Sequence, residues 1–231
     1  MVDESGELKP TTGIGKAKAK SEEGLKKIAG LPLVIVRLAA YVYGNADVKG
    51  LSPRLCIAAV YKKTKETLEY PKWFEENKIP TAHISDAVKA IWHLAVNGTA
   101  GSVYNVVDKN ETDQKKLNVI LEKLFGIKTD HLGTLKSEAL KLLPIESVLS
   151  EINADNTKVW LDMISSAKIE YTPLSPYLDS EVLQNNSYNI DGSAITKTGF
   201  TYDHPVVTDQ LIRDQTQWAI NENWFPSGYL Q

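Results

Sequence analysis

An arginine and two tyrosines follow the most apolar stretch of the chain. The segment LPLVIV predicts a strand over residues 33–39, and Arg37, Tyr41 and Tyr43 lie at or just beyond its end. In open parallel sheets, ligands bind outside the carboxyl ends of the strands. An arginine at such a place pairs with a carboxylate of the protein or with a phosphate of a ligand, and the sequence leaves both alternatives open.

A second arginine stands at the predicted start of a helix. Arg54 follows Ser52 and Pro53, and residues 54–64 carry the apolar spacing of a helix. Its guanidinium would clamp an anionic substrate there or lie in solvent. The sequence does not decide between these two interpretations.

Other chemical motifs are excluded by their context. The segment TGIGKAK has Lys18 where a phosphate-binding loop would need its third glycine, and no strand precedes it. No two histidines share metal-ligand spacing, so we predict no metal site. The single cysteine, Cys56, lies on an apolar helix, where a cysteine is more often part of the core than a nucleophile.

Composition narrows the class of protein. The chain has 231 residues, of which 42% are hydrophobic and 24% charged, and its formal net charge is −3. These values are typical of a globular domain with a sizeable core and no basic surface, so we expect no nucleic-acid partner. No apolar run reaches the length of a membrane span, and one cysteine fits a reducing compartment. We therefore expect a cytoplasmic protein without a membrane partner.

The elements that must position these residues are helices with few strands between them. Apolar periodicity and turn residues predict two or three strands. The predicted segments are a helix over 14–29, an extended piece over 79–84, a helix over 85–97, a strand over 101–108, a helix over 113–125, a helical region over 134–167 broken at Pro144, an extended segment over 171–179 and a last helix over 208–223. The first helix has a weakly apolar stripe of Ala17, Ser21, Leu25 and Ile28, and the helix over 113–125 has an apolar face of Leu117, Ile120, Leu121 and Leu124.

The helix over residues 85–97 has the clearest pattern. Ser85 or Asp86 is the expected N-cap. Its apolar residues recur at i, i+3, i+4 and i+7, which predicts one buried face. These residues are Val88, Ile91, Trp92 and Ala95.

The two clearest strands are expected to lie side by side. Residues 33–39 and 102–107 are separated by a crossover that contains a helix, which favours parallel neighbours in one sheet. A strand this apolar normally has partners on both edges. Since the chain encodes few, we expect an exposed edge at residues 33–39 and a homodimer or an aggregating chain.

Four motifs in order resemble the latter part of a known family. They are RLAAYVYG from Arg37, HISDAVKA from His83, YNV from Tyr104 and DGSAITKTGF from Asp191. Together they resemble extended (atypical) short-chain dehydrogenase/reductases of the NAD-dependent epimerase/dehydratase family. The resemblance implies an α/β fold, a partial doubly wound Rossmann-like parallel sheet with a mostly helical substrate-binding part.

The resemblance also implies roles for particular residues. Lys18 takes the place of the catalytic lysine that holds the nicotinamide ribose. The backbone that would contact NAD or NADP is Leu38, Ala39, Ala40 and Tyr41. Arg54 and His83 fall on the side of the substrate, a small molecule bearing a hydroxyl or carbonyl group.

The departures from the family pattern predict impaired chemistry. The family's catalytic tyrosine position is occupied by Ile14, or by Thr12 in the alternative register, and neither supplies the phenol proton. The Gly-rich turn of the family's first half is absent from residues 1–231, so we expect one incomplete domain. Residues 1–110 are expected to be the Rossmann remnant with helix 54–64 inserted, and residues 111–231 mainly the substrate-binding part.

Two functions remain open at this point. One is an NAD(P)-dependent oxidoreductase or epimerase-like protein, impaired or inactive as this chain alone. The alternative is a non-catalytic binding or regulatory protein, or a truncated gene product, of the same fold.

Overall fold

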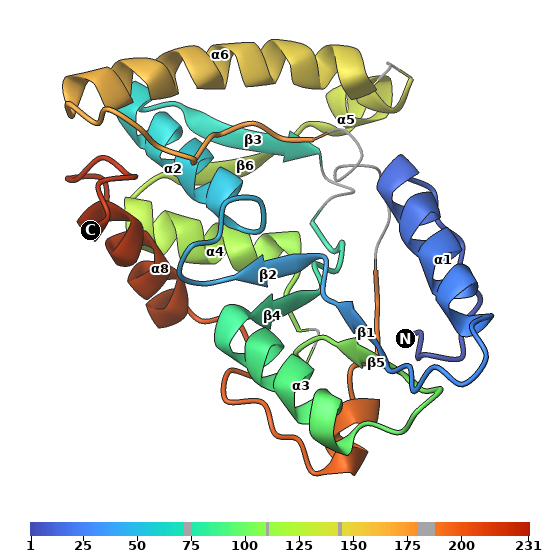
Figure 1. The fold of residues 1–231 in the computed structure, drawn as a ribbon. Coiled ribbons are helices and arrows are strands. Elements are labelled where there is room, and N and C mark those ends of the chain that lie inside the picture. The colour runs from blue at the N-terminus through green and yellow to red at the C-terminus, as the bar shows by residue number, and fades with distance from the viewer. Residues whose placement is uncertain (72–74, 110, 143–144, 180–187) are drawn as a thin grey trace.

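The computed structural model describes residues 1–71, 75–109, 111–142, 145–179 and 188–231. Helices and short strands alternate along this part of the chain (Figure 1). The elements are α1 (Gly13–Lys26), β1 (Ile35–Leu38), β2 (Tyr41–Tyr43), α2 (Ser52–Thr64), β3 (Thr67–Pro71), β4 (Thr81–His83), α3 (Ile84–Asn97), β5 (Val103–Val106), α4 (Gln114–Phe125), β6 (Lys128–Leu132), α5 (Thr134–Lys141), α6 (Ile145–Ser166), the 3-10 helix η2 (Ala194–Thr198) and α8 (Asp209–Asn221).

Every strand pair in the described residues is parallel. β1 pairs with β5, β2 with β4, and β3 with β6. The β1–β5 pair runs in register from Ile35 opposite Val103 to Leu38 opposite Val106, which confirms the predicted parallel neighbours. The Ala39 amide donates to the Val106 carbonyl and the Asp108 amide to the Thr81 carbonyl, so the first two pairs adjoin. The α/β class with parallel strands is therefore confirmed.

Three strands were not expected from the sequence. β2 lies in the stretch after the predicted strand, and it is separated from β1 by only two residues. β3 and β6 pair with each other although their sequences, TLEYP and KTDHL, are polar and largely exposed. Strands of this kind are stabilised by their partner rather than by an apolar pattern of their own.

Helix α3 begins one residue earlier than expected and turns its other face inward. His83, not Ser85 or Asp86, is the N-cap, and its ring accepts from the Ser85 amide. Asp86 is buried in the first turn and accepts from the backbone amides of Asp203 and His204. The buried apolar residues are Ala87, Ala90 and Leu94. The predicted inward residues Val88, Ile91, Trp92 and Ala95 are exposed.

Helix α1 stands apart from the rest of the molecule (Figure 1). It ends at Lys26 rather than at residue 29, and none of its residues is buried. The expected apolar stripe through Leu25 and Ile28 is exposed. Strand β1 beside it is only half-buried and ends on an exposed Leu38, although its segment is the most apolar stretch of the sequence.

The main core lies on the opposite side, between α2, α4, α6 and α8. The predicted apolar face of α4 is confirmed, since Leu117, Ile120, Leu121 and Leu124 are all buried. Cys56 is fully buried in the middle of α2, where burial raises the pKa of its thiol well above the ordinary value.

The helical region over 134–167 is divided into α5 and α6, while Pro144, the expected break, lies outside the described residues. The segment 171–179 forms no strand. It is held against α6 by the Trp160 indole N–H, which donates to the Leu174 carbonyl. No described helix is both long enough and apolar enough to cross a membrane.

Candidate functional site

The strand exit after β1 is partly occupied by contacts within the protein. The Arg37 guanidinium donates from Nε and Nη2 to the two carboxylate oxygens of Glu22, at 2.9 and 2.7 Å. This ion pair lowers the pKa of Glu22 and raises that of Arg37. Of the two alternatives for Arg37, the carboxylate partner is the one that the structure contains. The pair joins α1 to β1.

The residues predicted to contact a nicotinamide cofactor surround this ion pair. Lys18 lies one helical turn before Glu22, is exposed and makes no ion pair with a described carboxylate. Ile14, at the expected tyrosine position, is 63% exposed. At the strand exit Leu38 and Ala40 are exposed, whereas Ala39 and Tyr41 are buried. Lys18 is thus accessible on α1, and two of the four strand-exit residues are exposed.

A cavity of about 210 Å³ opens on the other side of the strand exit. Its walls come from α2, β3, α4, β6 and α6 and are mostly apolar. The lining residues that carry polar groups are Arg54, Tyr61, Glu69, Tyr70, Gln114, Asn118 and Asn156. Ligand cavities usually combine such apolar walls with a few fixed polar groups.

Arg54 is the charged group in the wall of this cavity that is buried. Its residue is only 9% exposed, and its guanidinium carbon lies 5.0 Å from the centre of the Tyr41 ring. No described carboxylate forms a salt bridge with it, and Glu69 lies on the exposed face of β3. A buried arginine without a carboxylate partner costs free energy that an anion would offset. The solvent alternative for Arg54 is therefore wrong.

Two asparagines that line this cavity carry buried amide groups without a partner among the described residues. The Nδ2 atoms of Asn118 and Asn156 are buried and make no hydrogen bond within the described structure. Asn118 accepts from the Gln114 side chain through Oδ1, so its orientation is fixed. A buried donor left without an acceptor costs about 1–3 kcal/mol. Either side chain would have to rotate before its Nδ2 could donate to a ligand in the cavity.

His83, the other predicted substrate residue, does not line this cavity. Its Nδ1 lies 2.7 Å from the Ser85 hydroxyl, and its ring meets Tyr43 and His204 edge-on, with centroids 5.2 and 4.2 Å apart. Burial and the neighbouring His204 lower the pKa of His83. The structure thus separates His83 from Arg54. A substrate role for His83 remains a prediction.

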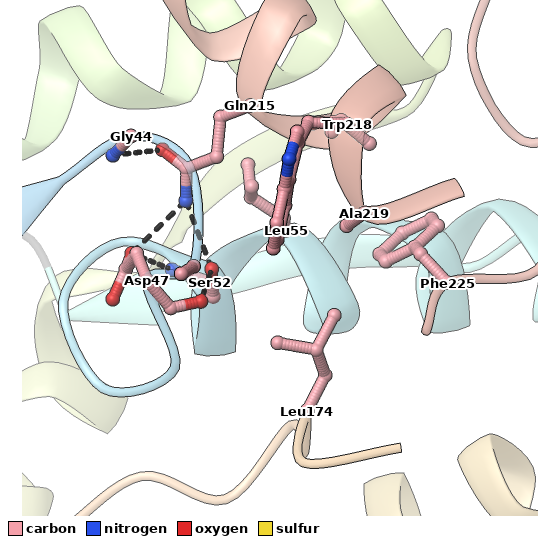
Figure 2. A pocket seen from close by; sticks show the side chains of 11 residues that line it. Gly44, Asp47, Ser52, Leu55, Leu174, Gln215, Trp218, Ala219 and Phe225 are labelled. Atoms are coloured by element: carbon pink, nitrogen blue, oxygen red, sulfur yellow. Dashed lines mark hydrogen bonds between the residues drawn. The ribbon is translucent and has the colours of Figure 1, made fainter. Parts of the chain in front are cut away.

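A second, much smaller cavity lies at the start of α2 and is filled by the protein's own polar groups (Figure 2). The Gln215 side chain accepts from the Gly44 amide and donates to Asp47 and to the Ser52 hydroxyl, at 2.8–2.9 Å. The remaining space is about 10 Å³, enough for roughly one water molecule. This cluster joins α8 to the loop before α2 and is not a ligand site.

The described residues do not fit a whole dinucleotide. A pyrophosphate needs free backbone N–H groups at a helix N-terminus. At α2 those groups, on residues 50–52, already donate to the Asp47 carboxylate. The N-termini of α1, α3, α4 and α8 are capped by side chains of their own. Nor do three metal-ligating side chains meet anywhere in the described ranges.

The polar lining of the large cavity could have been found from the sequence in part. Gln114, Leu117, Asn118 and Leu121 recur at i, i+3, i+4 and i+7, so Asn118 stands on the buried face of a leucine-rich helix. A polar residue at core spacing indicates either a structural hydrogen bond or a binding site. Asn156 gave a weaker signal because α6 is less regular in its apolar spacing.

The fold belongs to a recognised class. Parallel strands, crossover helices and the covering α2–α4–α6–α8 layer match Rossmann-like structures of NAD-dependent epimerases and dehydratases over most of the chain. The identities lie below 20%, so the likeness shows the fold alone. No protein-family profile and no curated protein matches the sequence.

Three solved structures illustrate the match. A dTDP-glucose 4,6-dehydratase from Bacillus anthracis str. Ames, in complex with NAD, has a TM-score of 0.62 at 15% identity, covering 96% of this chain and 57% of that one. DesIV, a dTDP-glucose 4,6-dehydratase from Streptomyces venezuelae with NAD and TYD bound, gives 0.61 at 17%, with 97% and 56% covered. MoeE5, in complex with UDP-glucuronic acid and NAD, gives 0.58 at 15%, with 96% and 60% covered.

This chain spans less than two thirds of the length of these proteins.

Proposed function

We propose that this chain binds the substrate of an NAD(P)-dependent epimerase or dehydratase type of reaction in the cavity around Arg54. The substrate class is a nucleotide-linked sugar, a small hydroxyl- or carbonyl-bearing molecule with a diphosphate. The observation that carries the proposal is a buried guanidinium that has no carboxylate partner among the described residues and lies in the wall of a cavity that Asn118 and Asn156 also line. The structural neighbours solved with TYD or UDP-glucuronic acid support this class.

Each polar group has a distinct task in this proposal. Arg54 would pair with a phosphate oxygen, because a guanidinium offers planar paired donors that match phosphate geometry. Asn118 and Asn156 would donate to sugar or base oxygens. The apolar walls and Tyr70 would cover the flat faces of the ligand and exclude water.

A nicotinamide cofactor would meet the chain on the α1 side. We propose that Lys18 and the backbone of Leu38, Ala39, Ala40 and Tyr41 contact it, with His83 nearer the substrate. When bound, such a cofactor supplies hydride transfer. Lys18 would hold a ribose hydroxyl, but Ile14 has no proton to donate, so this chain alone is proposed to bind substrate without turning it over.

The division into residues 1–110 and 111–231 remains part of the proposal. Both parts line the cavity: α2 and β3 come from the first, and α4, β6 and α6 from the second. Substrate binding therefore needs both parts of the chain in one folded unit.

The test is isothermal titration with UDP-glucuronic acid, UDP and uridine. We expect the diphosphates to bind and uridine to bind at least about tenfold more weakly, because the nucleoside has no anion for Arg54. Arg54→Gln should remove that preference. Arg213→Gln is the matched control, because this arginine is only partly buried, does not line the cavity and donates to the terminal Gln231 carbonyl instead.

Two results would contradict the proposal. One is equal affinity for uridine and UDP. The other is unchanged UDP affinity in a folded Arg54→Gln variant.

A non-catalytic regulatory protein is the second candidate, and Ile14 favours it. A chain of this kind would bind the same nucleotide sugar as a signal. The two candidates differ in turnover rather than in binding, and the Ile14→Tyr variant described below separates them.

A further inference from the structure

Three of the four histidines of the chain lie where α3 meets residues 194–206. His83 is the N-cap of α3, His93 lies further along the helix, and His204 belongs to the segment that Figure 1 shows in orange beside α3. The fourth histidine, His131, lies on β6. We call the contact between α3 and residues 194–206 the α3 junction. Because histidine is the side chain whose charge changes between about pH 5 and 8, the α3 junction gathers groups that titrate there.

The rings of His83 and His204 meet across the α3 junction. They lie edge-on, with ring centroids 4.2 Å apart, and both side chains are partly buried. Two imidazolium rings at this separation would repel each other, since a neighbouring like charge disfavours the charged form. Burial and His204 together lower the pKa of His83. The contact therefore favours His83 without a charge.

The hydrogen bond that caps α3 also requires a neutral His83. The Ser85 amide can only donate, so the Nδ1 atom of His83, 3.4 Å away, is the acceptor and carries no proton. The Ser85 hydroxyl lies 2.7 Å from the same nitrogen. An imidazolium has two donors and no acceptor. Protonation of His83 therefore removes the N-cap of α3.

His93 is also bound in its neutral form. The side-chain amide of Asn97 donates from Nδ2 to the His93 carbonyl and lies 3.3 Å from Nδ1 of the ring. Because Nδ2 is a donor, Nδ1 accepts from it and the single ring proton is on Nε2. Nε2 donates to the Thr198 hydroxyl at 2.8 Å, and that hydroxyl donates to the Ile195 carbonyl. A second ring proton would set N–H against N–H at Asn97.

The two carboxylates of the α3 junction are bonded to other donors. Asp86 is buried and accepts from the backbone amides of Asp203 and His204, at 2.9 and 2.8 Å. The Asp203 carboxylate pairs with Lys89. Asp86 favours the charged form of His83, but this attraction is smaller than the opposing influences of burial and His204.

Two tyrosines and a third carboxylate lie near the α3 junction. Tyr43 is fully buried and meets His83 edge-on, with centroids 5.2 Å apart. Burial raises the pKa of Tyr43 and of Tyr202, so both phenols stay neutral in the range where histidine titrates. Asp108 accepts from the Thr81 hydroxyl. We therefore expect the histidines to govern how the charge of the α3 junction changes below neutral pH.

Residues 194–206 help to cover a small core of their own. Ile195 and Phe200 of this segment are 0% and 2% exposed. They pack in one cluster with buried side chains of α3 and β5, namely Ala90, Leu94, Tyr104 and Val106. This cluster is distinct from the main core between α2, α4, α6 and α8. The segment can therefore separate from α3 without opening the main core.

We propose that the α3 junction is an acid-sensitive contact, in which residues 194–206 are docked on α3 while the three histidines are neutral and separate from it as the histidines gain protons. The inference does not depend on the proposed function, because none of the three histidines lines the Arg54 cavity.

Linkage gives the direction of the effect. In the separated form His83 has its ordinary pKa of 6.5, and in the docked form its pKa is lower. The separated form therefore binds protons first as the pH falls, and the docked population declines below about pH 6.5. The decline ends once the pH has passed the lowered pKa of the docked form.

Amide hydrogen exchange at pH 7.5 and 5.5 tests the proposal, with each rate divided by the intrinsic rate at that pH. We expect the protection of residues 194–206 and of the first turn of α3 to fall at least about fivefold at the lower pH. The protection of α4, which belongs to the main core, should not change.

The double variant His83→Asn/His204→Gln should keep its protection at pH 5.5. Neither new side chain titrates, and asparagine still offers an acceptor to the Ser85 amide because it is a preferred N-cap residue. His131→Gln is the matched control and should show the same fall as the wild type. His204→Gln alone leaves the N-cap of α3 in place and should show a smaller fall, so it tests the ring contact even if the double variant does not fold.

Three results would overturn the proposal. One is equal protection of residues 194–206 at both pH values in the wild-type chain. Another is a fall that the folded double variant or His204→Gln retains in full. The third is a fall that His131→Gln abolishes.

Discussion

The two sides of the strand exit differ in how firmly the protein holds them. On one side, the cavity around Arg54 is built from helices that share a continuous core, which includes fully buried Leu117, Leu124 and Phe125. On the other side, α1 has no buried residue and is tied to β1 by the Glu22–Arg37 ion pair. The side proposed to bind substrate is therefore preformed by this chain. The side proposed to meet a cofactor depends on little more than one ion pair in the described residues.

This difference indicates that ligand binding in the cavity does not depend on contacts made by α1. A preformed cavity can bind without ordering any segment, so little conformational entropy opposes binding. A helix without buried side chains has a low free energy of local opening. Ligand binding at the cavity should therefore be robust, and cofactor contact through α1 should be weak.

The largest expected effect concerns turnover. A positioned general acid or base contributes about 10²–10⁴-fold to a rate. With Ile14 in the tyrosine position we expect no measurable NAD-dependent dehydrogenase or epimerase turnover of nucleotide sugars. Nicotinamide absorbance measures net oxidation, and chromatography of the sugar products measures epimerisation, which leaves the cofactor unchanged overall. Ile14 is exposed, so Ile14→Tyr should fold normally. Turnover gained by Ile14→Tyr would favour an impaired enzyme over a regulatory protein.

Cofactor titration sharpens the same point. NAD and NADP are expected to bind far more weakly than UDP-glucuronic acid in calorimetry. If either binds at micromolar concentration and Lys18→Ala abolishes that binding, a working cofactor site is present and the non-catalytic alternative is wrong. Binding that Lys18→Ala leaves unchanged would mean that α1 is not the catalytic helix.

The next effect in size separates the stabilities of the two sides. Leu124→Ala should lower the free energy of unfolding by about 2–5 kcal/mol, because its side chain is fully buried between helices. Leu25→Ala on α1 should change it by less than about 0.5 kcal/mol, as for an ordinary surface position. Urea denaturation of both variants measures the difference. Similar losses would show that α1 is packed as firmly as the core.

Removal of the Gln215 side-chain amide should have an intermediate effect. Gln215→Leu leaves the Gly44 amide without its acceptor and takes a donor from Asp47 and Ser52. We expect a loss of about 1–3 kcal/mol. Gln217→Leu on the same helix is the control, since the exposed Gln217 side chain donates to the exposed Asn221 instead. Equal thermal unfolding of the two variants would refute a role for the Gln215 cluster.

The smallest effect concerns the pH dependence of the α1 contact. The Arg37 hydrogen bond lowers the pKa of Glu22 below its ordinary value of 4.5, so the pair stabilises the fold above that value. This contribution is lost as the pH falls through the lowered pKa. It should amount to less than about 1 kcal/mol. Amide hydrogen exchange along α1 should accelerate in Glu22→Gln at neutral pH, and Glu23→Gln is the control.

The sequence predicted the elements whose residues were themselves apolar and regularly spaced. The parallel pair of β1 and β5 and the buried face of α4 were both predicted and found. β3 and β6 were missed, because residues such as Thr67, Glu69 and Lys128 carry no apolar alternation. Their strand conformation comes from pairing across sixty residues of sequence, which local pattern does not report.

Helix α3 shows why an apolar stripe alone can mislead. Its sequence contains two possible faces, one with Val88, Ile91 and Trp92, and one with Ala87, Ala90 and Leu94. The face with Ala87, Ala90 and Leu94 packs against the sheet, because small residues let a helix backbone approach closely. For the cavity, Arg54 was predicted to face a substrate; it lines the cavity, and its role in binding stays a prediction. Asn118 and Asn156 could not be assigned to one cavity from the sequence, because α4 and α6 come together only in the fold.

The buried thiol of Cys56 can report the local opening of helix α2. It is the single cysteine, it lies in α2 with Arg54 and Ile57 close by in sequence, and no solvent reaches it. A thiol-labelling reagent can react only when α2 opens, so the labelling rate measures the population of that open state. A nucleotide that occupies the neighbouring cavity should hold α2 in place and slow the labelling in proportion to its occupancy. The labelling rate of Cys56 therefore reports ligand binding, and no cysteine has to be introduced for this measurement.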